Sequence, residues 1–189
     1  MVMFDMGVNI SPNTTKSEVN MIIQKLDKIF SVVLIVEKLD ESLILMKEKL
    51  CWEFSDIAYL LKNVRKDDWK SQINSDMRLK LRALNDADSR LYSYFLSRHE
   101  TAVDRYGRDK MAKQVRLLNQ HNDLLMQECS INMTETFLIK RPIGKDKSNY
   151  YKTNNSMSKN CRLSMSSELE LIQMVRDHTN EMINAESYL

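Results

Sequence analysis

The sequence has very little glycine: Gly7, Gly107 and Gly144 are the only three among 189 residues. None of them stands in a Gly-x-x-x-x-Gly-Lys-Ser/Thr or a Gly-x-Gly-x-x-Gly pattern. Loops that wrap a nucleotide phosphate with backbone amides normally need such a pattern, because glycine lets the backbone approach the phosphate closely. A nucleotide-phosphate loop of this kind therefore lies outside this chain or is absent.

Long apolar runs and a strong net charge are lacking too. The longest apolar run, residues 32–36, is far shorter than the roughly 20 residues that a membrane-spanning helix needs. Residues 1–20 lack the basic start and apolar stretch of a secretory signal peptide. The net charge is +2 and no basic stripe is interleaved with aromatic residues, so no nucleic-acid partner is expected. On these absences alone, a cytosolic protein is the default interpretation.

Motifs for metal binding and covalent catalysis are missing as well. No His-x-x-x-His, Gly-x-Ser-x-Gly or Cys-x-x-Cys pattern occurs. The three cysteines, Cys51, Cys129 and Cys161, are not spaced as zinc ligands, so no metal site is expected. Three cysteines allow one disulfide with one free thiol, or three reduced thiols, and their spacing does not choose between these arrangements.

Four asparagines begin the Asn-x-Ser/Thr pattern that accepts N-linked glycans. The pattern is short and chance matches are common, so it has a meaning only if the chain enters the secretory pathway. The four asparagines are Asn9, Asn13, Asn132 and Asn154.

The overall composition is that of an ordinary globular protein. Hydrophobic residues make up 43% of the chain and charged residues 29%, which are common proportions for soluble domains. The length suits one domain with a substantial core, so residues 1–189 are expected to form a single domain. Residues 140–160 are rich in Lys, Asn and Ser, and we expect a loop or a disordered connection there.

The first third of the chain predicts a helix followed by a strand. Residues 15–30 have apolar side chains at helical spacing, and Thr15 with Glu18 fits a capping box at the start of that helix. Residues 31–39 follow with a β-branched run that has no periodicity, which predicts a strand buried on both faces.

A second helix and a more ambiguous segment come next. Asp40 is placed to be the N-cap of a helix over residues 41–52. A helix, an internal strand and another helix in succession indicate an α/β layer. Residues 56–64 predict either a second strand or a short helix.

From about residue 76 onward the sequence is helical in pattern. Ser167 and Glu170 form a second capping box before a terminal helix over residues 169–183. The apolar positions of the earlier helices recur at multiples of three and four residues. They are Leu81, Leu84, Leu91, Tyr92, Phe95, Val103, Met111, Val115, Leu118, Leu125 and Cys129.

Few residues stand out as carriers of chemistry. Glu37 closes the predicted strand, where a carboxylate needs a partner or exposure to water. A basic group follows residue 61 and could hold a phosphate or sulfate, although a solvated loop face is the commoner explanation. Its members are Lys62, Arg65, Lys66 and Lys70. The three histidines, His99, His121 and His178, are far apart and are expected to be exposed on helices.

Five segments together resemble the galactose 3-O-sulfotransferase family. The strongest is residues 32–65, "VVLIVEKLDESLILMKEKLCWEFSDIAYLLKNVR", in which "DESL" and "LCWE" match the family in order. The others keep that order along the chain. They are "FDMG" (4–7), "LNDADSRLYSYF" (84–95), "RYGRDKMAKQV" (105–115) and "NCRLSMSSELELI" (160–172). The segments resemble the glycolipid-directed, galactosylceramide-sulfating branch, and glycoprotein-directed members share the same motifs.

The resemblance implies a fold, a reaction and a place in the cell. It implies the C-terminal part of a P-loop-like sulfotransferase fold, an α/β architecture that is here mostly helical with one or two strands. Family members transfer sulfate from 3′-phosphoadenosine 5′-phosphosulfate (PAPS) to the 3-hydroxyl of a terminal galactose on a glycolipid or glycoprotein. They are anchored in the Golgi membrane with the catalytic domain in the lumen, so an anchor is expected only in the full-length protein.

The resemblance also assigns residues. Lys62, Asn63 and Arg65 in the "KNVR" match become candidates for contact with PAPS, and Glu37 and Asp40 for organising the end of the predicted strand. A luminal address would make the four glycosylation patterns usable and would allow Cys129 and Cys161 to pair.

The family's phosphosulfate loop and presumed catalytic residues lie upstream of "FDMG" in its members. We therefore expect this chain to be a fragment of a sulfotransferase domain that does not catalyse sulfation alone. The alternative is a non-catalytic helical interaction module or an inactive relic of the family.

Overall fold

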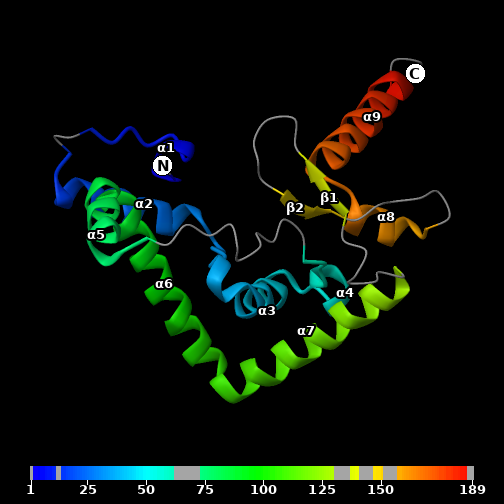
Figure 1. The fold of residues 1–189 in the computed structure, drawn as a ribbon, viewed down its shortest axis with the longest axis horizontal. Helices are drawn as coiled ribbons and strands as arrows, with labels where there is room; N and C mark the ends of the chain where they lie inside the picture. The colour runs from blue at the N-terminus through cyan, green and yellow to red at the C-terminus, as the bar shows by residue number, and fades with distance from the viewer. Residues whose placement is uncertain are drawn as a thin grey trace. The chain divides into compact units, whose positions relative to one another are not determined.

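Helices dominate the part of the chain that the structure describes. The computed structural model describes residues 2–11, 14–61, 73–129, 137–140, 147–150 and 157–186 (Figure 1). The chain divides into two compact units, each with its own core. Unit 1 comprises Met1–Ile57 and Ser71–Leu118, and unit 2 comprises Ala58–Lys70 and Asn119–Leu189. The expectation of a mostly helical chain is confirmed.

Unit 1 is built from short and long helices. Its two longest helical stretches come late in the sequence, and the short elements precede them. The elements are α1 (Val2–Asp5), α2 (Lys16–Ile29), the 3-10 turn η1 (Val36–Lys38), α3 (Leu39–Leu50), α4 (Phe54–Ile57), α5 (Ser75–Leu84), α6 (Asp86–Tyr106) and the first part of α7 (Arg108–Glu128).

The helix predicted over residues 15–30 is confirmed as α2, and so is its capping box. The backbone N–H of Thr15 donates to Glu18 Oε2 at 2.7 Å, and the N–H of Glu18 donates to Thr15 Oγ1 at 3.3 Å. The hydrogen bond from the Thr15 backbone, followed by the one from its hydroxyl, lowers the pKa of Glu18. The box therefore holds Glu18 in its charged form at the positive end of the helix dipole.

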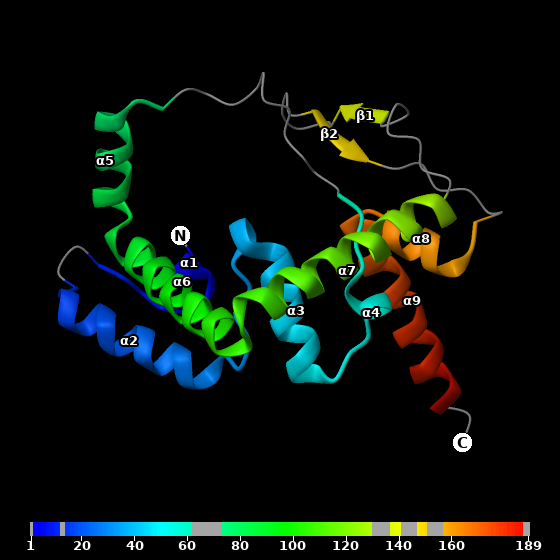
Figure 2. The same ribbon diagram turned by 90° about the horizontal axis from the view of Figure 1, so that it is seen from below.

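A buried line along α6 organises the first core of unit 1. Leu91 and Phe95 are buried against α2 and the short helix α1, and Figure 2 shows α2 running alongside α6. Asp88 of α6 accepts hydrogen bonds from the first backbone N–H groups of α1, at 3.1 Å from Val2 and 3.0 Å from Met3. The buried members of this core are Met3, Val19, Ile23, Leu26, Ile35, Leu91 and Phe95.

Gly107 joins α6 to α7 and lets the chain turn between them. Its φ is +95°, a conformation that side-chain-bearing residues rarely adopt. Its N–H donates to the carbonyl of Val103 at 3.0 Å, which closes the end of α6. The second core of unit 1 forms around this turn and includes Ile44, Ile57, Val103, Met111 and Leu118.

The prediction of a strand over residues 31–39 is wrong. Residues 31–35 are irregular, and the chain then enters η1. The backbone of Ile35 bonds to the Ser42 side chain of α3 where a strand would bond to a neighbouring strand. The Ser42 hydroxyl accepts a hydrogen bond from the N–H of Ile35 at 3.0 Å and donates one to the Ile35 carbonyl at 3.4 Å. Ile35 is buried, but Val36 is 79% exposed, so the β-branched run is not buried on both faces. β propensity mainly reports packing against neighbouring strands, and here the neighbour is a helix.

Two local predictions beside this segment need correction. Helix α3 begins at Leu39 with Lys38 as its N-cap residue, so Asp40 lies in the first turn and is not the cap. A carboxylate there still complements the helix dipole. Of residues 56–64, Asp56 and Ile57 end the short helix α4, residues 58–61 are irregular, and the remainder lies outside the described residues.

The apolar pattern after residue 76 predicts which side chains are buried more accurately in α6 and α7 than in α5. Val103, Met111 and Leu118 are buried as expected. In contrast, Leu81 and Leu84 of α5 are 43% and 79% exposed. The spacing identified helices correctly, but apolar residues recur at helical spacing even where no described partner covers them.

Unit 2 contains the end of α7, a hairpin and two helices. Strands β1 (Phe137–Lys140) and β2 (Lys147–Tyr150) pair antiparallel with Phe137 opposite Tyr150. Helices α8 (Lys159–Met165) and α9 (Glu168–Glu186) follow. The predicted capping box is confirmed, because the N–H of Ser167 donates to Glu170 Oε2 at 2.6 Å and the N–H of Glu170 to Ser167 Oγ at 3.3 Å.

Two expectations about chain organisation are left as predictions. Residues 141–146 and 151–156 of the expected loop over 140–160 lie outside the described residues, and β2 lies between them. A single sulfotransferase domain likewise stays a prediction. Within the described residues, no helix combines the length and hydropathy needed to cross a bilayer.

Leu118 offers a test of the second core. Leu118→Ala should lower the free energy of unfolding by about 2–5 kcal/mol, because Leu118 is fully buried and the truncation leaves a cavity. Leu117→Ala makes the same change one residue earlier on α7, where the side chain is 40% exposed, and should shift stability by no more than about 0.5 kcal/mol. Chemical denaturation of both variants measures the difference, and equal losses would contradict this description of the core.

Candidate functional site

The donor-contact residues assigned by the resemblance, Lys62, Asn63 and Arg65, lie outside the described residues. So do three of the four glycosylation candidates, Asn13, Asn132 and Asn154. Asn9 is described and lies exposed between α1 and α2. Glu37 is exposed on η1. A group of charged side chains in the described part of unit 1 is found next to Glu37.

This group surrounds a hollow of about 440 Å³ at the start of α3, which we call the α3 hollow. Helix α3 and the preceding turn supply three carboxylates and one lysine, and α7 supplies Arg108. The apolar lining comes from α3, α6 and α7. The lining residues are Glu37, Lys38, Leu39, Asp40, Glu41, Val103, Arg108, Met111, Ala112 and Val115.

A buried histidine stands behind one of these carboxylates. His99 of α6 is only 5% exposed, and its Nε2 lies 3.2 Å from Glu41 Oε2. The expectation that all three histidines are exposed is therefore wrong for His99, although His178 is exposed. A buried polar ring needs a hydrogen-bond partner, and Glu41 provides it.

The sequence did contain a signal for this burial. His99 continues the line of Leu91 and Phe95 and precedes Val103, each four residues from the next, and all four side chains are buried. Residues at this spacing share one face of a helix. The prediction of exposure considered only that the histidines are far apart in the sequence. It overlooked that His99 lies on the same face of its helix as three apolar residues.

Both cations of the α3 hollow are already paired with carboxylates. Lys38 Nζ lies 3.9 Å from Glu41 Oε2 and 3.9 Å from Glu100 Oε1. Arg108 donates to Asp104 Oδ1 at 2.6 Å and to Glu100 Oε2 at 3.2 Å, and these hydrogen bonds, led by that to Asp104, raise its pKa. An incoming anion would have to compete with these carboxylates.

The charge balance of the α3 hollow decides what it can do chemically. Its three carboxylates outnumber its two cations, so a polyanion such as a nucleotide phosphosulfate does not fit it. Carboxylates accept hydrogen bonds from hydroxyl groups and can take up their protons. Among the described residues, no group of three or more His, Cys, Asp and Glu side chains is arranged to hold a metal ion.

Another hollow in unit 1, of about 610 Å³, includes His99 in its lining. Tyr106 lines it as well and donates a hydrogen bond to Glu48 Oε1 at 3.2 Å. Burial, together with the charge and hydrogen bond of Glu48, raises the pKa of Tyr106 to about 12. Lys110 of α7 places its Nζ 4.0 Å from the centre of the Tyr106 ring.

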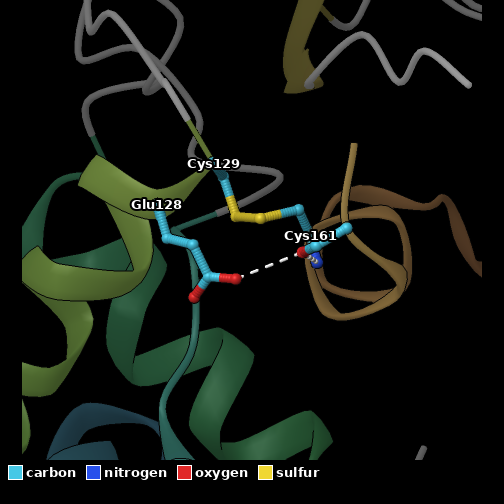
Figure 3. Close-up of a disulfide and its surroundings, with 4 residues drawn as sticks. Glu128, Cys129 and Cys161 are labelled. Carbon is cyan, nitrogen blue, oxygen red and sulfur yellow. Dashed lines mark hydrogen bonds between the residues drawn. A yellow bond between two sulfur atoms is a disulfide. The ribbon is translucent and has the colours of Figure 1, made fainter. Parts of the chain in front are cut away.

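In unit 2, a disulfide joins the two cysteines that the resemblance pairs. Cys129 follows α7 and Cys161 lies on α8, with their Cα atoms 5.3 Å apart (Figure 3). Beside the bond, Ser158 caps α8 by accepting from the N–H of Cys161 at 3.2 Å and donates its hydroxyl hydrogen to Glu128 at 3.1 Å. Both cysteines belong to the buried cluster of unit 2, with Leu60 and Met165.

Comparison with known proteins gives a consistent result. The family model described as galactose-3-O-sulfotransferase matches residues 1–147. The human galactosylceramide sulfotransferase is 32% identical over 129 residues, which are 68% of this chain and 30% of that protein. Galactose-3-O-sulfotransferase 3 of Bos taurus is 28% identical over 120 residues, 63% of this chain and 28% of that protein. The chain thus spans less than a third of these relatives, and no solved structure matches it.

The disulfide should contribute to the stability of unit 2. Cys129 and Cys161 are 32 positions apart, and opening a loop of this size costs about 3–4 kcal/mol of stability because the unfolded chain gains freedom. Cys161→Ser should therefore speed hydrogen exchange in α8 and in residues 119–128 of α7. Cys51 is a free, exposed thiol, so Cys51→Ser is the control. Equal exchange in both variants would contradict a structural role for the bond.

Tyr106 should make stability depend on pH above the ordinary tyrosine range. Its folded pKa of about 12 lies above the usual 10.0, so the folded protein holds the proton more tightly. This contribution is complete below pH 10 and is lost as the pH rises toward 12. Tyr106→Phe should flatten that part of the stability profile in denaturation experiments. Tyr92→Phe, at an exposed tyrosine of the same helix, is the comparison, and an identical slope in both variants would contradict the assignment.

Proposed function

Because this chain belongs to the galactose-3-O-sulfotransferase family, we propose that it forms part of an enzyme that sulfates the 3-hydroxyl of a terminal galactose. The observation that carries the proposal is the family match over residues 1–147, which includes all of unit 1. The acceptor is a glycolipid or a glycoprotein glycan. Galactosylceramide is the first choice, because the galactosylceramide sulfotransferases are the more similar of the two groups compared.

We propose that PAPS is the sulfate donor and that the residues contacting it lie outside the α3 hollow. Lys62 and Arg65 offer charge, and Asn63 offers a neutral amide donor, all suited to phosphate oxygens. The α3 hollow is a poor donor site, since its cations are paired with Glu41, Glu100 and Asp104. The glycine-containing loop for the phosphosulfate has no counterpart in this sequence, so we propose that another segment of the enzyme supplies it.

The proposed reaction is a transfer between two oxygens. The galactose 3-oxygen forms a bond to sulfur, the bond from sulfur to the donor phosphate oxygen breaks, and the hydroxyl proton passes to a base. As in phosphoryl transfer, the protein contributes by positioning the two substrates and stabilising negative charge. Within the proposed enzyme, unit 1 would supply a helical wall of the cleft.

We propose a luminal Golgi location. The disulfide between Cys129 and Cys161 supports this location, because disulfides persist in oxidising compartments and are rare in the cytosol. Exposed Asn9 would then be open to glycosylation. Asn13, Asn132 and Asn154 are further candidates on sequence grounds.

A chimeric enzyme tests the proposed function. The segment of human galactosylceramide sulfotransferase that aligns with this chain is replaced by the corresponding residues of this chain, and the product is assayed with labelled PAPS. We expect sulfate transfer to galactosylceramide and none to glucosylceramide, in which one hydroxyl of the sugar is inverted. A secreted, folded chimera that binds the donor product but sulfates neither lipid would contradict the proposal.

Variants of the same chimera test the donor residues. Lys62→Ala together with Arg65→Ala should raise the KM for PAPS by at least about tenfold, because each removes a charge-assisted hydrogen bond. Lys66→Ala together with Lys70→Ala removes the same net charge nearby and is the control. An equal effect of the two pairs would point to general electrostatics and against the assignment.

A further inference from the structure

We propose that the α3 hollow binds the galactose of the acceptor, with the Glu41 carboxylate accepting hydrogen bonds from its hydroxyl groups. His99 acts as a positioning residue that fixes this carboxylate from behind. The proposal rests on the proposed function and adds to it a location and two residue roles. It is argued from charge, lining and the contacts of Glu41.

The charges of the α3 hollow favour a neutral ligand with several hydroxyl donors. Carboxylates are acceptors only, and the hollow is lined by Glu37, Asp40 and Glu41. The cations Lys38 and Arg108 are already held by carboxylates, at distances of 2.6 to 3.9 Å. A sugar hydroxyl can donate to a carboxylate without displacing these ion pairs, whereas an anion would have to break them.

The apolar side chains cited for the lining of the hollow belong to the core and expose little surface to a ligand. Val103 and Met111 are each 2% exposed and belong to the second core of unit 1. Their position is therefore set by core packing and does not depend on a ligand. A volume of about 440 Å³ lies within the range of small-molecule sites, which combine an apolar lining with a few fixed polar groups.

The contacts of Glu41 leave it able to serve a ligand. Within the described residues, His99 and Lys38 both approach Oε2, at 3.2 and 3.9 Å. The Glu41 side chain is 28% exposed, while that of His99 is 3% exposed. The imidazole thus limits the rotation of the carboxylate, and the remaining oxygen can face the hollow. Such support from behind keeps a binding group in one orientation.

The test is an NMR titration of the isotope-labelled full chain with methyl β-galactoside. We expect millimolar affinity and saturating shifts centred on the Met111 methyl group and on the backbone of Glu41 and Ala112. Methyl β-glucoside differs in the configuration of one hydroxyl and should bind more weakly. Shifts centred elsewhere, equal binding of the two sugars, or no saturable shift would each overturn the proposal.

Variants then separate the two residue roles. Glu41→Gln, nearly equal in shape, should weaken galactoside binding by about tenfold or more, because it removes a charged acceptor. His99→Gln keeps a donor toward Glu41 and should bind like the native chain, whereas His99→Leu should bind more weakly. Native-like spectra without ligand confirm that each variant folds. Unchanged affinity in Glu41→Gln would overturn the assignment, and equal affinities in the two His99 variants would overturn the positioning role.

The chimera distinguishes failure of this inference from failure of the proposed function. An active chimera combined with galactoside shifts outside the α3 hollow would mean that the enzyme holds its acceptor elsewhere. An inactive, folded chimera would contradict the function itself, whatever the sugar titration shows.

Discussion

Unit 1 depends on one buried line of side chains along α6. Leu91 and Phe95 pack into the core that α1 and α2 complete, and Val103 packs into the core around the turn to α7. His99 lies between these two apolar parts, where a ring without a partner would cost free energy. The carboxylate of Glu41 meets that need. The contact between His99 and Glu41 thus gives the buried ring a hydrogen-bond partner. It also holds the Glu41 carboxylate at the edge of the α3 hollow.

Much of the helical structure could be predicted because its signals are local. Thr15 with Glu18, and Ser167 with Glu170, cap helices with side chains three residues apart, and the structure contains both boxes. The strand over 31–39 could not be judged locally, because a β-branched run becomes a strand only when another strand pairs with it. The Ser42 side chain bonds to the Ile35 backbone instead, and no sequence pattern around Ile35 predicts this hydrogen bond.

The candidate site was predicted only in part, for a similar reason. The sequence drew attention to Glu37 and Asp40 because they follow an apolar run, and both line the α3 hollow. It did not reveal Glu41 as the partner of His99, because that contact joins residues 58 positions apart. The family was visible from short collinear segments, and the match over residues 1–147 supports it. The relatives are more than three times as long as the matched segment, so unit 1 must be considered together with the remainder of such an enzyme.

The turn at Gly107 bears on how this protein can vary. A Cβ atom built there would lie 3.8 Å from the Cβ of Lys110, an ordinary contact, so space does not exclude a larger residue. The backbone angle does, because φ is +95°. A residue with a side chain at this position is therefore strained whatever the space around it. The strain would fall on the turn beside the second core of unit 1, so its cost would be shared by core side chains such as Val103 and Met111.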